Sequence, residues 1–359
     1  MRGLLAASLV LVAAAAGPAS DPWSKAMKKR GIDPELVENP IAITPEIRAA
    51  ANRFASGVGG TVDQLRRIQG ALYDRSRFSF DYDSEQTLTA SEALAARRGN
   101  CVAFTNLFIA MGRARGLSVK AGYLTPRAVG RKRGDLVYVQ AHVVAVYPLH
   151  DRSVVFDFYR MREDPSVPIR LLDDFELAAL YLNNRAVEAI SRDELSVAGA
   201  RLDAVLKLAP RFAPAYGNLG VLRRRSGDIP GALDAYRSAL ALAPHDPAIL
   251  GNLAALYYGI GRDHEARAAL KLADLNVATP YVILARGDLE AADGHVDAAL
   301  RFYRKAARHD PKIVEPQLAI ARLTRASGRI ADAKRAAQRA LSVDPGNVEA
   351  KAILDEVSR

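Results

Sequence analysis

The chain contains 359 residues, of which 50% are hydrophobic, so it can bury more than one core and two domains are the expected organisation. Its formal net charge is +10, which favours contact with anionic surfaces. Because no nucleic-acid recognition motif and no interleaving of aromatic and basic residues accompany this charge, we expect no nucleic-acid partner. The 6 histidines show no metal-ligand spacing, so we expect neither a catalytic metal nor another cofactor.

The first 20 residues have the layout of a secretory signal peptide. Met1-Arg2 precedes an apolar run from Leu4 to Ala16, and small residues follow up to Ser20. We therefore expect cleavage before Asp21 and export to the periplasm or the medium, with an uncleaved N-terminal anchor as the alternative. No later segment is long and apolar enough to cross a bilayer, so we expect no membrane span after cleavage.

The segments before the cysteine are predicted to be an extended lead-in followed by helices. Residues 21–43 are polar and broken by prolines, which indicates the lead-in. A helix is predicted from Thr44 to about Ser56, with proline in its first position. A second helix is predicted from Thr61, where Thr61 and Gln64 have the spacing of a capping box. Both helices are expected to cover a catalytic core.

Cys101 is the only cysteine, so in an exported protein it cannot form an intramolecular disulfide. It stands at the start of a predicted helix that runs to about Arg115 and ends at Gly116, with one apolar face formed by Phe104, Leu107, Phe108 and Met111. Unpaired N–H groups and the helix dipole favour a thiolate there, and the same N–H groups could receive an oxyanion. The alternative is an inert, buried cysteine.

Two β-branched, aromatic runs after this helix predict a pair of strands, Leu136–Tyr147 and Val154–Tyr159, around a turn at 148–152. If the hairpin is symmetric about Leu149-His150, His142 lies directly opposite Asp157, with both side chains on one face. The expected set is therefore a thiolate, an imidazole and a carboxylate: Cys101, His142 and Asp157.

Other residues are expected around this set. Tyr138 and Gln140 share the strand face of His142, so they are predicted to line the same cleft, together with Asn100. The stretch from Thr125 to Asp135 is rich in basic residues. A solvated loop is the favoured interpretation of this stretch, and a basic lip that attracts an acidic substrate is the alternative.

These residues resemble the core of the transglutaminase-like superfamily, which has a papain-like fold. The resemblance lies in Arg98-Gly99-Asn100-Cys101, in the helix that follows, and in strands that carry His142 and Asp157. It implies an α+β domain over about 44–178 and cysteine acyl chemistry on amides. By this resemblance Cys101 is the nucleophile, His142 the general base and acid, and Asp157 the residue that orients His142.

The second half of the chain repeats itself with a period of about 34 residues. Gly227, Gly261, Gly294 and Gly328 are separated by 34, 33 and 34 residues, and an alanine follows each by five places. Prolines close four units, at Pro210, Pro244, Pro311 and Pro345. This pattern resembles the tetratricopeptide repeat (TPR), a pair of helices per unit. We predict five units over 180–345, the first with Asp193 in the glycine position, and a capping helix over 346–359.

Together these features predict an exported α+β transglutaminase-like domain followed by an all-α TPR solenoid. The favoured function is acyl chemistry on amides or peptides by a Cys-His-Asp triad, as a hydrolase or an acyltransferase, with a protein or peptide bound on the concave face of the repeats. The alternative is a degenerate, non-catalytic domain in a scaffold of the cell envelope.

Overall fold

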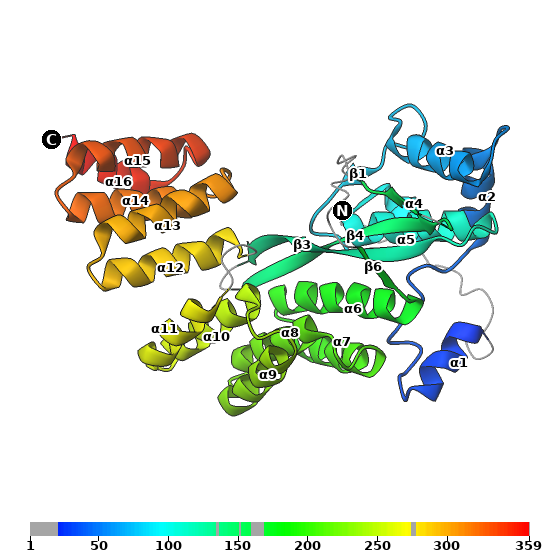
Figure 1. The fold of residues 1–359 in the computed structure, drawn as a ribbon, viewed down its shortest axis with the longest axis horizontal. Coiled ribbons are helices and arrows are strands. Elements are labelled where there is room, and N and C mark those ends of the chain that lie inside the picture. The colour runs from blue at the N-terminus through cyan, green and yellow to red at the C-terminus, as the bar shows by residue number, and fades with distance from the viewer. Residues whose placement is uncertain (1–20, 134–135, 151, 159–168, 274–277, 359) are drawn as a thin grey trace, which may run out of the picture.

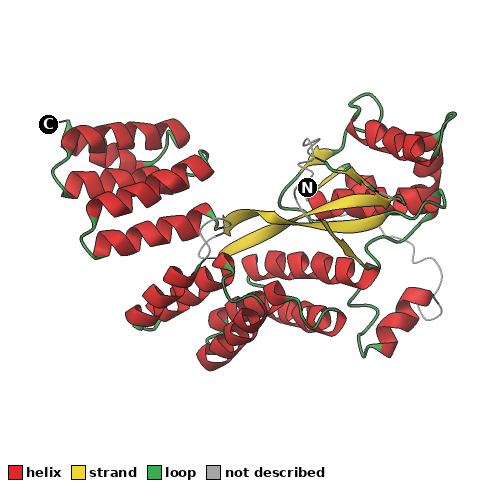
Figure 2. Cartoon of the chain, in the orientation of Figure 1, coloured by secondary structure: helices red, strands yellow, loops and turns green. Residues whose placement is uncertain are grey.

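The computed structural model describes residues 21–133, 136–150, 152–158, 169–273 and 278–358. Within these ranges a mixed α/β part comes first and an all-helical part follows, which confirms the predicted fold class (Figures 1 and 2). The mixed part contains α1 (Pro22–Lys29), α2 (Pro45–Ala55), α3 (Thr61–Tyr73), β1 (Asp81–Tyr82), α4 (Ala90–Ala96), β2 (Arg98–Gly99), α5 (Cys101–Ala114), β3 (Lys120–Arg133), β4 (Leu136–Pro148), β5 (Ser153–Phe156) and β6 (Ile169–Leu172).

The centre of the mixed part is α5, the helix that begins at Cys101. Every residue from Cys101 to Gly112 is buried. The helix packs against α2, α3 and α4 and against a four-stranded sheet in the order β5-β4-β3-β6, whose neighbouring strands are antiparallel. Because most of these buried residues are apolar and they lie on every side of the helix, the enclosed position stabilises it.

The predicted helix at Thr44 is confirmed as α2, which is capped by the Thr44 hydroxyl. The second helix also forms, but its N-cap is Gly60 rather than Thr61, and Asp63 accepts the Gly60 N–H at 3.1 Å. The lead-in prediction was wrong for 22–29, which form α1. The Asp21 carboxylate caps that helix at the N–H groups of Trp23 and Ser24, and Pro22 occupies its first turn.

The interpretation of 125–135 as a solvated loop was wrong for 125–133, because this stretch belongs to β3. Its backbone pairs with β4, from Val129 opposite Gln140 to Arg133 opposite Leu136, after an irregularity between Leu124 and Val129. Backbone pairing with β4 therefore makes this charged run a strand instead of a loop. Residues 134–135 lie outside the described ranges, and so does the predicted signal peptide at 1–20.

The helical part consists of consecutive helix pairs and a last single helix. These are α6 (Asp174–Ser191), α7 (Leu195–Leu208), α8 (Ala213–Arg225), α9 (Ile229–Leu242), α10 (Pro247–Gly259), α11 (Asp263–Leu272), α12 (Pro280–Ala292), α13 (Val296–His309), α14 (Glu315–Ala326), α15 (Ile330–Val343) and α16 (Val348–Val357). Within each pair, from α6 and α7 to α14 and α15, the two helices pack on each other.

The repeated residues have distinct structural roles. The four glycines lie between the helices of a pair with φ between +69° and +80°, and Asp193 has φ +62° at the same place in the first pair. A Cβ at any of these glycines would meet nothing within 4 Å, so backbone conformation and not close packing accounts for them. Close packing is provided by the fully buried alanines: Ala232, Ala266, Ala299 and Ala333.

The two parts are joined through α6 and do not have separate cores. The expected boundary near residue 179 falls inside α6, which packs on β3 and β6 as well as on α7 and α8. One continuous hydrophobic cluster runs from Met27 to Leu256, whereas the later repeats have small clusters of their own. Among the described residues no helix combines the length and the apolarity required to span a membrane.

Candidate active site

The turn that delivers Cys101 is held by backbone pairing on one side and by a helix cap on the other. Strand β2 pairs in parallel with β1, and the Asn100 N–H donates to the Gln86 carbonyl at 2.9 Å. Gly99 has φ +149°, and a Cβ there would lie 2.4 Å from the Ala103 Cβ. Only glycine fits this position, so the glycine of the basic-Gly-x-Cys pattern has a steric cause.

The Asn100 side chain caps α5 directly beside the thiol. Its Oδ1 accepts the N–H groups of Val102 at 3.0 Å and Ala103 at 3.1 Å, and its Nδ2 donates to the Thr87 hydroxyl at 2.7 Å. Asn100 is 1% exposed. It was predicted to line a cleft, but the structure gives it the role of a buried cap.

His142 contacts both other members of the predicted set. Its Nε2 lies 2.9 Å from Asp157 Oδ2, and its ring also forms a side-chain hydrogen bond with Cys101. All three groups are removed from solvent: Cys101 is 3% exposed, His142 8%, and the Asp157 side chain 11%. The structure thus brings the three predicted side chains together, with His142 between the other two.

The register that predicted this contact was wrong by two residues. Ala145 pairs with Phe156, whereas symmetry about Leu149-His150 would have paired it with Val154. A shift of two keeps every side chain on the same face, so His142 and Asp157 remain diagonal neighbours instead of direct opposites. A shift of one would have separated them.

The electrostatics of the set favour a charged imidazole. Burial alone would lower the pKa of His142, but the hydrogen bonds with Asp157 and Cys101 and the negative charges of these partners raise it to about 9. At neutral pH the His142 ring is therefore charged, and it lies within hydrogen-bond reach of both Asp157 and Cys101.

Asp157 is held from α3, a helix that the sequence predicted only as cover. The Tyr73 hydroxyl donates to the Asp157 carbonyl, and Gln69 Nε2 donates to the same oxygen at 3.2 Å. Phe158 then packs among aromatic rings, with centroid distances of 5.3 Å to Tyr82 and 5.5 Å to Phe104. The aromatic pattern of 156–158 was visible in the sequence, but its partners lie too far away along the chain to be identified.

His142 is held from α5. The Thr105 hydroxyl donates to the carbonyl of Val143 at 3.1 Å, which fixes β4 to the helix one turn after Cys101. The backbones of Tyr138 and Gln140 pair with Arg131 and Val129 of β3, and their side chains lie outside the described part.

Oxyanion binding by the first turn of α5 is more restricted than the sequence suggested. Two of its N–H groups, those of Val102 and Ala103, are engaged by Asn100. An indole N–H could also donate to an oxyanion, but the chain has a single tryptophan, Trp23. Its indole donates to the Val37 carbonyl at 2.8 Å and stacks on Phe175 with centroids 5.6 Å apart. These three donors are therefore committed to the structure.

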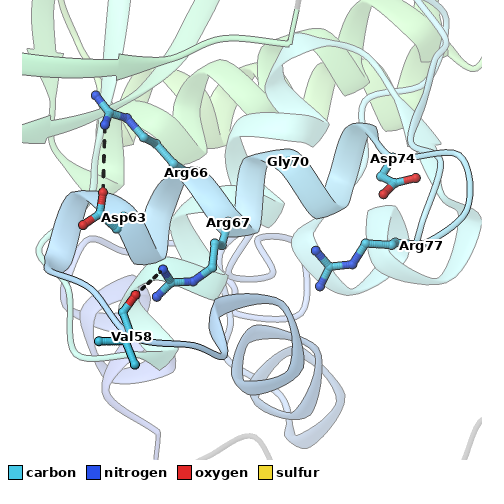
Figure 3. Close-up of a pocket in the computed structure, with 7 residues that line it drawn as sticks. All are labelled: Val58, Asp63, Arg66, Arg67, Gly70, Asp74 and Arg77. Atoms are coloured by element: carbon cyan, nitrogen blue, oxygen red, sulfur yellow. Dashed lines mark hydrogen bonds and ion pairs between the residues drawn. The ribbon is translucent and has the colours of Figure 1, made fainter.

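A surface depression of about 520 Å³ lies elsewhere, over α3 and its flanking loops (Figure 3). Its lining includes Arg66, Arg67 and Arg77 but no member of the Cys-His-Asp set. Arg67 donates to the carbonyls of Ala55, Gly57 and Val58, so it fastens the α2–α3 loop. We assign this depression a structural role. Over the described residues no group of three His, Cys, Asp or Glu is placed to hold a metal ion.

Comparison with known families agrees with both halves of this description. Residues 48–149 match the model of the transglutaminase-like superfamily, and residues 223–289 match a tetratricopeptide repeat model. The chain therefore joins a transglutaminase-like domain to a TPR region. TPR regions of this kind support protein–protein interaction. No curated protein matches the sequence significantly.

Similar solved structures include pilF of Pseudomonas aeruginosa, with 18% identity, 52% of this chain and 85% of that chain covered, and a TM-score of 0.46. PilW, described as a widely conserved type IV pilus biogenesis factor, has 19% identity and a TM-score of 0.43. The match covers 50% of this chain and 84% of that chain. YrrB, described as a TPR protein with an unusual peptide-binding site, has 20% identity and a TM-score of 0.37. The match covers 48% of this chain and 90% of that chain. At these scores the likeness carries no functional conclusion.

Proposed function

We propose that the protein is a cysteine-dependent enzyme that cleaves or transfers acyl groups from amides or peptides. The observation that carries the proposal is the pair of hydrogen bonds made by the His142 ring, one with Asp157 Oδ2 at 2.9 Å and one with Cys101. A merely structural histidine needs neither a thiol nor a carboxylate as partner, whereas a nucleophile with its base and orienting group needs all three.

In the proposed reaction the Cys101 thiolate attacks the carbonyl carbon of the amide and forms a C–S bond. The imidazolium of His142 then gives its proton to the leaving nitrogen as the C–N bond breaks, and an amine departs. Water, or another amine, loses a proton to His142 and attacks the thioester, which releases the acid or the new amide and restores Cys101. Asp157 keeps the ring oriented in both steps.

The repeats are proposed to bind a protein substrate or partner on their concave face. The hairpin supports this link, because β4, which carries His142, also packs on α10, and β3 packs on α12 (Figure 1). The first helices of the pairs thus border the sheet of the transglutaminase-like domain. A segment bound along them would lie beside that domain, which would favour its delivery to the site.

We further propose export, on the basis of residues 1–20. Export would place Cys101, the only cysteine, in an oxidising compartment, where it has no intramolecular partner for a disulfide.

The experiment that tests the enzyme proposal is acylation with p-nitrophenyl acetate. We expect the mature protein to release p-nitrophenol and to gain one acetyl group on Cys101, detected by mass spectrometry of the peptide. His142→Gln should reduce the rate by at least about a hundredfold, and Cys101→Ala should give the background. Acylation no faster than this background would contradict the proposal.

A scaffold without catalysis is the second candidate, and one observation favours it. The Val102 and Ala103 N–H groups and the indole of Trp23 are all engaged within the structure, so none of them is available to an oxyanion. This candidate predicts that the protein binds its partner equally well with Cys101→Ala and shows no acylation above background.

A further inference from the structure

The segment between β1 and α4 passes between the cysteine helix and the first helix of the repeats. On one side, Asn100 donates its N–H to the Gln86 carbonyl at 2.9 Å, and Asn106 Nδ2 donates to the Leu88 carbonyl at 3.0 Å. On the other side, the Thr87 N–H donates to Glu188 of α6 at 3.0 Å. This segment therefore links α5 to α6 by hydrogen bonds.

Glu188 is a buried charged residue that the proposed chemistry does not use. It is 8% exposed, and its second carboxylate oxygen accepts from Arg185 at 3.1 Å. The same Arg185 nitrogen donates to the Thr87 carbonyl at 3.4 Å. Both backbone polar groups of Thr87 are thus held by α6. A buried carboxylate is costly unless it is fully bonded, so helix pairing alone does not explain its place.

Thr87 passes this constraint to the cysteine turn through its hydroxyl. The hydroxyl accepts from Asn100 Nδ2 at 2.7 Å, and this bond turns Asn100 Oδ1 toward the N–H groups of Val102 and Ala103. Thr87 and Asn100 are each 1% exposed, so water cannot replace either partner. The first turn of α5, which carries Cys101, is therefore oriented by a chain of direct hydrogen bonds that begins in α6.

We propose that Glu188 is a positioning residue for the Cys101 nucleophile and acts through Thr87 and Asn100. The inference rests on the proposed function of Cys101. It means that the first helix of the repeats completes the active site, although the helix contributes no catalytic group. A fragment that ends before α6 would hold all three members of the triad but would not orient its thiol.

Two conservative variants of the full chain separate the hydrogen bond between Glu188 and Thr87 from the negative charge of Glu188. Glu188→Asp keeps the charge beside Arg185 but is one methylene too short to reach Thr87, whereas Glu188→Gln keeps the acceptor and loses the charge. The readout is the ratio of Cys101 alkylation rates by iodoacetamide at about pH 6 and at about pH 8.5, which reports ion pairing with His142. Glu194→Asp, in an exposed pair with Arg192, is the matched control.

We expect Glu188→Asp to lower this ratio by at least about tenfold, and Glu188→Gln and Glu194→Asp to keep it within about twofold. A wild-type ratio in Glu188→Asp would overturn the inference. If Glu188→Asp fails to fold, Thr87→Val takes its place, because this substitution removes only the hydroxyl contact. Thr87→Val must then lower the ratio of alkylation rates by the same factor, and Thr87→Ser, which keeps the hydroxyl, must retain the wild-type ratio.

Amide hydrogen exchange at Val102 and Ala103 separates failure of this inference from failure of the proposed function. We expect exchange about tenfold faster in Glu188→Asp than in Glu188→Gln. If wild-type Cys101 is unreactive at acid pH, the proposed function fails, and this exchange difference alone decides whether Glu188 orients the turn. Equal exchange in the two variants would overturn the inference.

Discussion

The repeats and the cysteine site are organised by contacts of different range. In the repeats, each recurring residue acts within its own helix pair: a glycine, or Asp193 in the first pair, turns the chain at positive φ, an alanine packs, and in four pairs a proline follows the second helix. At the site, contacts join residues 84 positions apart, as for Tyr73 and Asp157, or 101 apart, as for Thr87 and Glu188. Local rules therefore account for the solenoid, and the site depends on the whole mixed fold.

The two regions also differ in their cores. The site shares one hydrophobic cluster with the first repeats, up to Leu256, whereas the repeats from α12 onward rest on small clusters rich in alanine. A change near the site should consequently disturb a large cooperative unit, and a change in the late repeats should remain local.

The largest effect is expected from alanine at Gly99, with the same change at Gly328 for comparison. At Gly99 a Cβ would lie 2.4 Å from Ala103, and φ is +149°; at Gly328 nothing lies within 4 Å, and φ is +69°. We expect Gly99→Ala to lower the free energy of unfolding by about 4 kcal/mol and Gly328→Ala by about 1 kcal/mol. Urea denaturation measures both. Equal losses of unfolding free energy in the two variants would contradict the difference in packing between the cysteine site and the late repeats.

The second effect is the pH dependence that His142 confers on stability. Its pKa is raised to about 9, so the fold favours the charged ring, and the stabilisation is complete below the ordinary value of about 6.5 and lost as pH rises through about 9. Between these limits the wild type should lose up to about 3 kcal/mol relative to His142→Gln. Denaturation of both proteins at about pH 6 and about pH 10 tests this, and parallel pH profiles would refute it.

A smaller effect is expected from removing one hydroxyl, with a tyrosine of the repeats as control. Tyr73 donates to the carbonyl of Asp157, whereas Tyr216 donates to the nearby carbonyl of Pro210 at 3.1 Å. Tyr73→Phe should cost about 1 kcal/mol and slow acylation of Cys101 about fivefold. Tyr216→Phe should leave acylation unchanged. If the two variants acylate at the same rate, Tyr73 does not position Asp157.

The smallest effect is expected at an exposed ion pair between the last repeat and the final helix, α16. Arg322 and Glu349 lie 3.0 Å apart with side chains 53% and 43% exposed. Glu349→Ala should change the free energy of unfolding by about 0.3 kcal/mol or less. A loss above about 1 kcal/mol would mean that the late repeats depend on their surface charges, contrary to the local packing described here.

Sequence reasoning succeeded at several features with a local cause, although it missed α1, whose cap at Asp21 is equally local. The cap at Thr44, the start of α5 at Cys101 and the solenoid pattern each depend on residues a few positions apart. The approach of His142 to Asp157 was foreseen with the wrong register, because alternation of faces tolerates an error of two. Strand β3 and the supports from Gln69, Tyr73 and Glu188 depend on partners that no local pattern identifies.

The measurement that tests the central claim most directly is the pH profile of Cys101 alkylation in the protein, compared with His142→Gln and with the denatured chain. The account predicts a wild-type rate that stays high down to about pH 6, well below the ordinary ionisation of a thiol near 8.5. His142→Gln should follow the denatured chain. Slow wild-type labelling that rises only in alkaline solution, and that is unchanged by the substitution, would contradict an activated cysteine and leave the scaffold as the function.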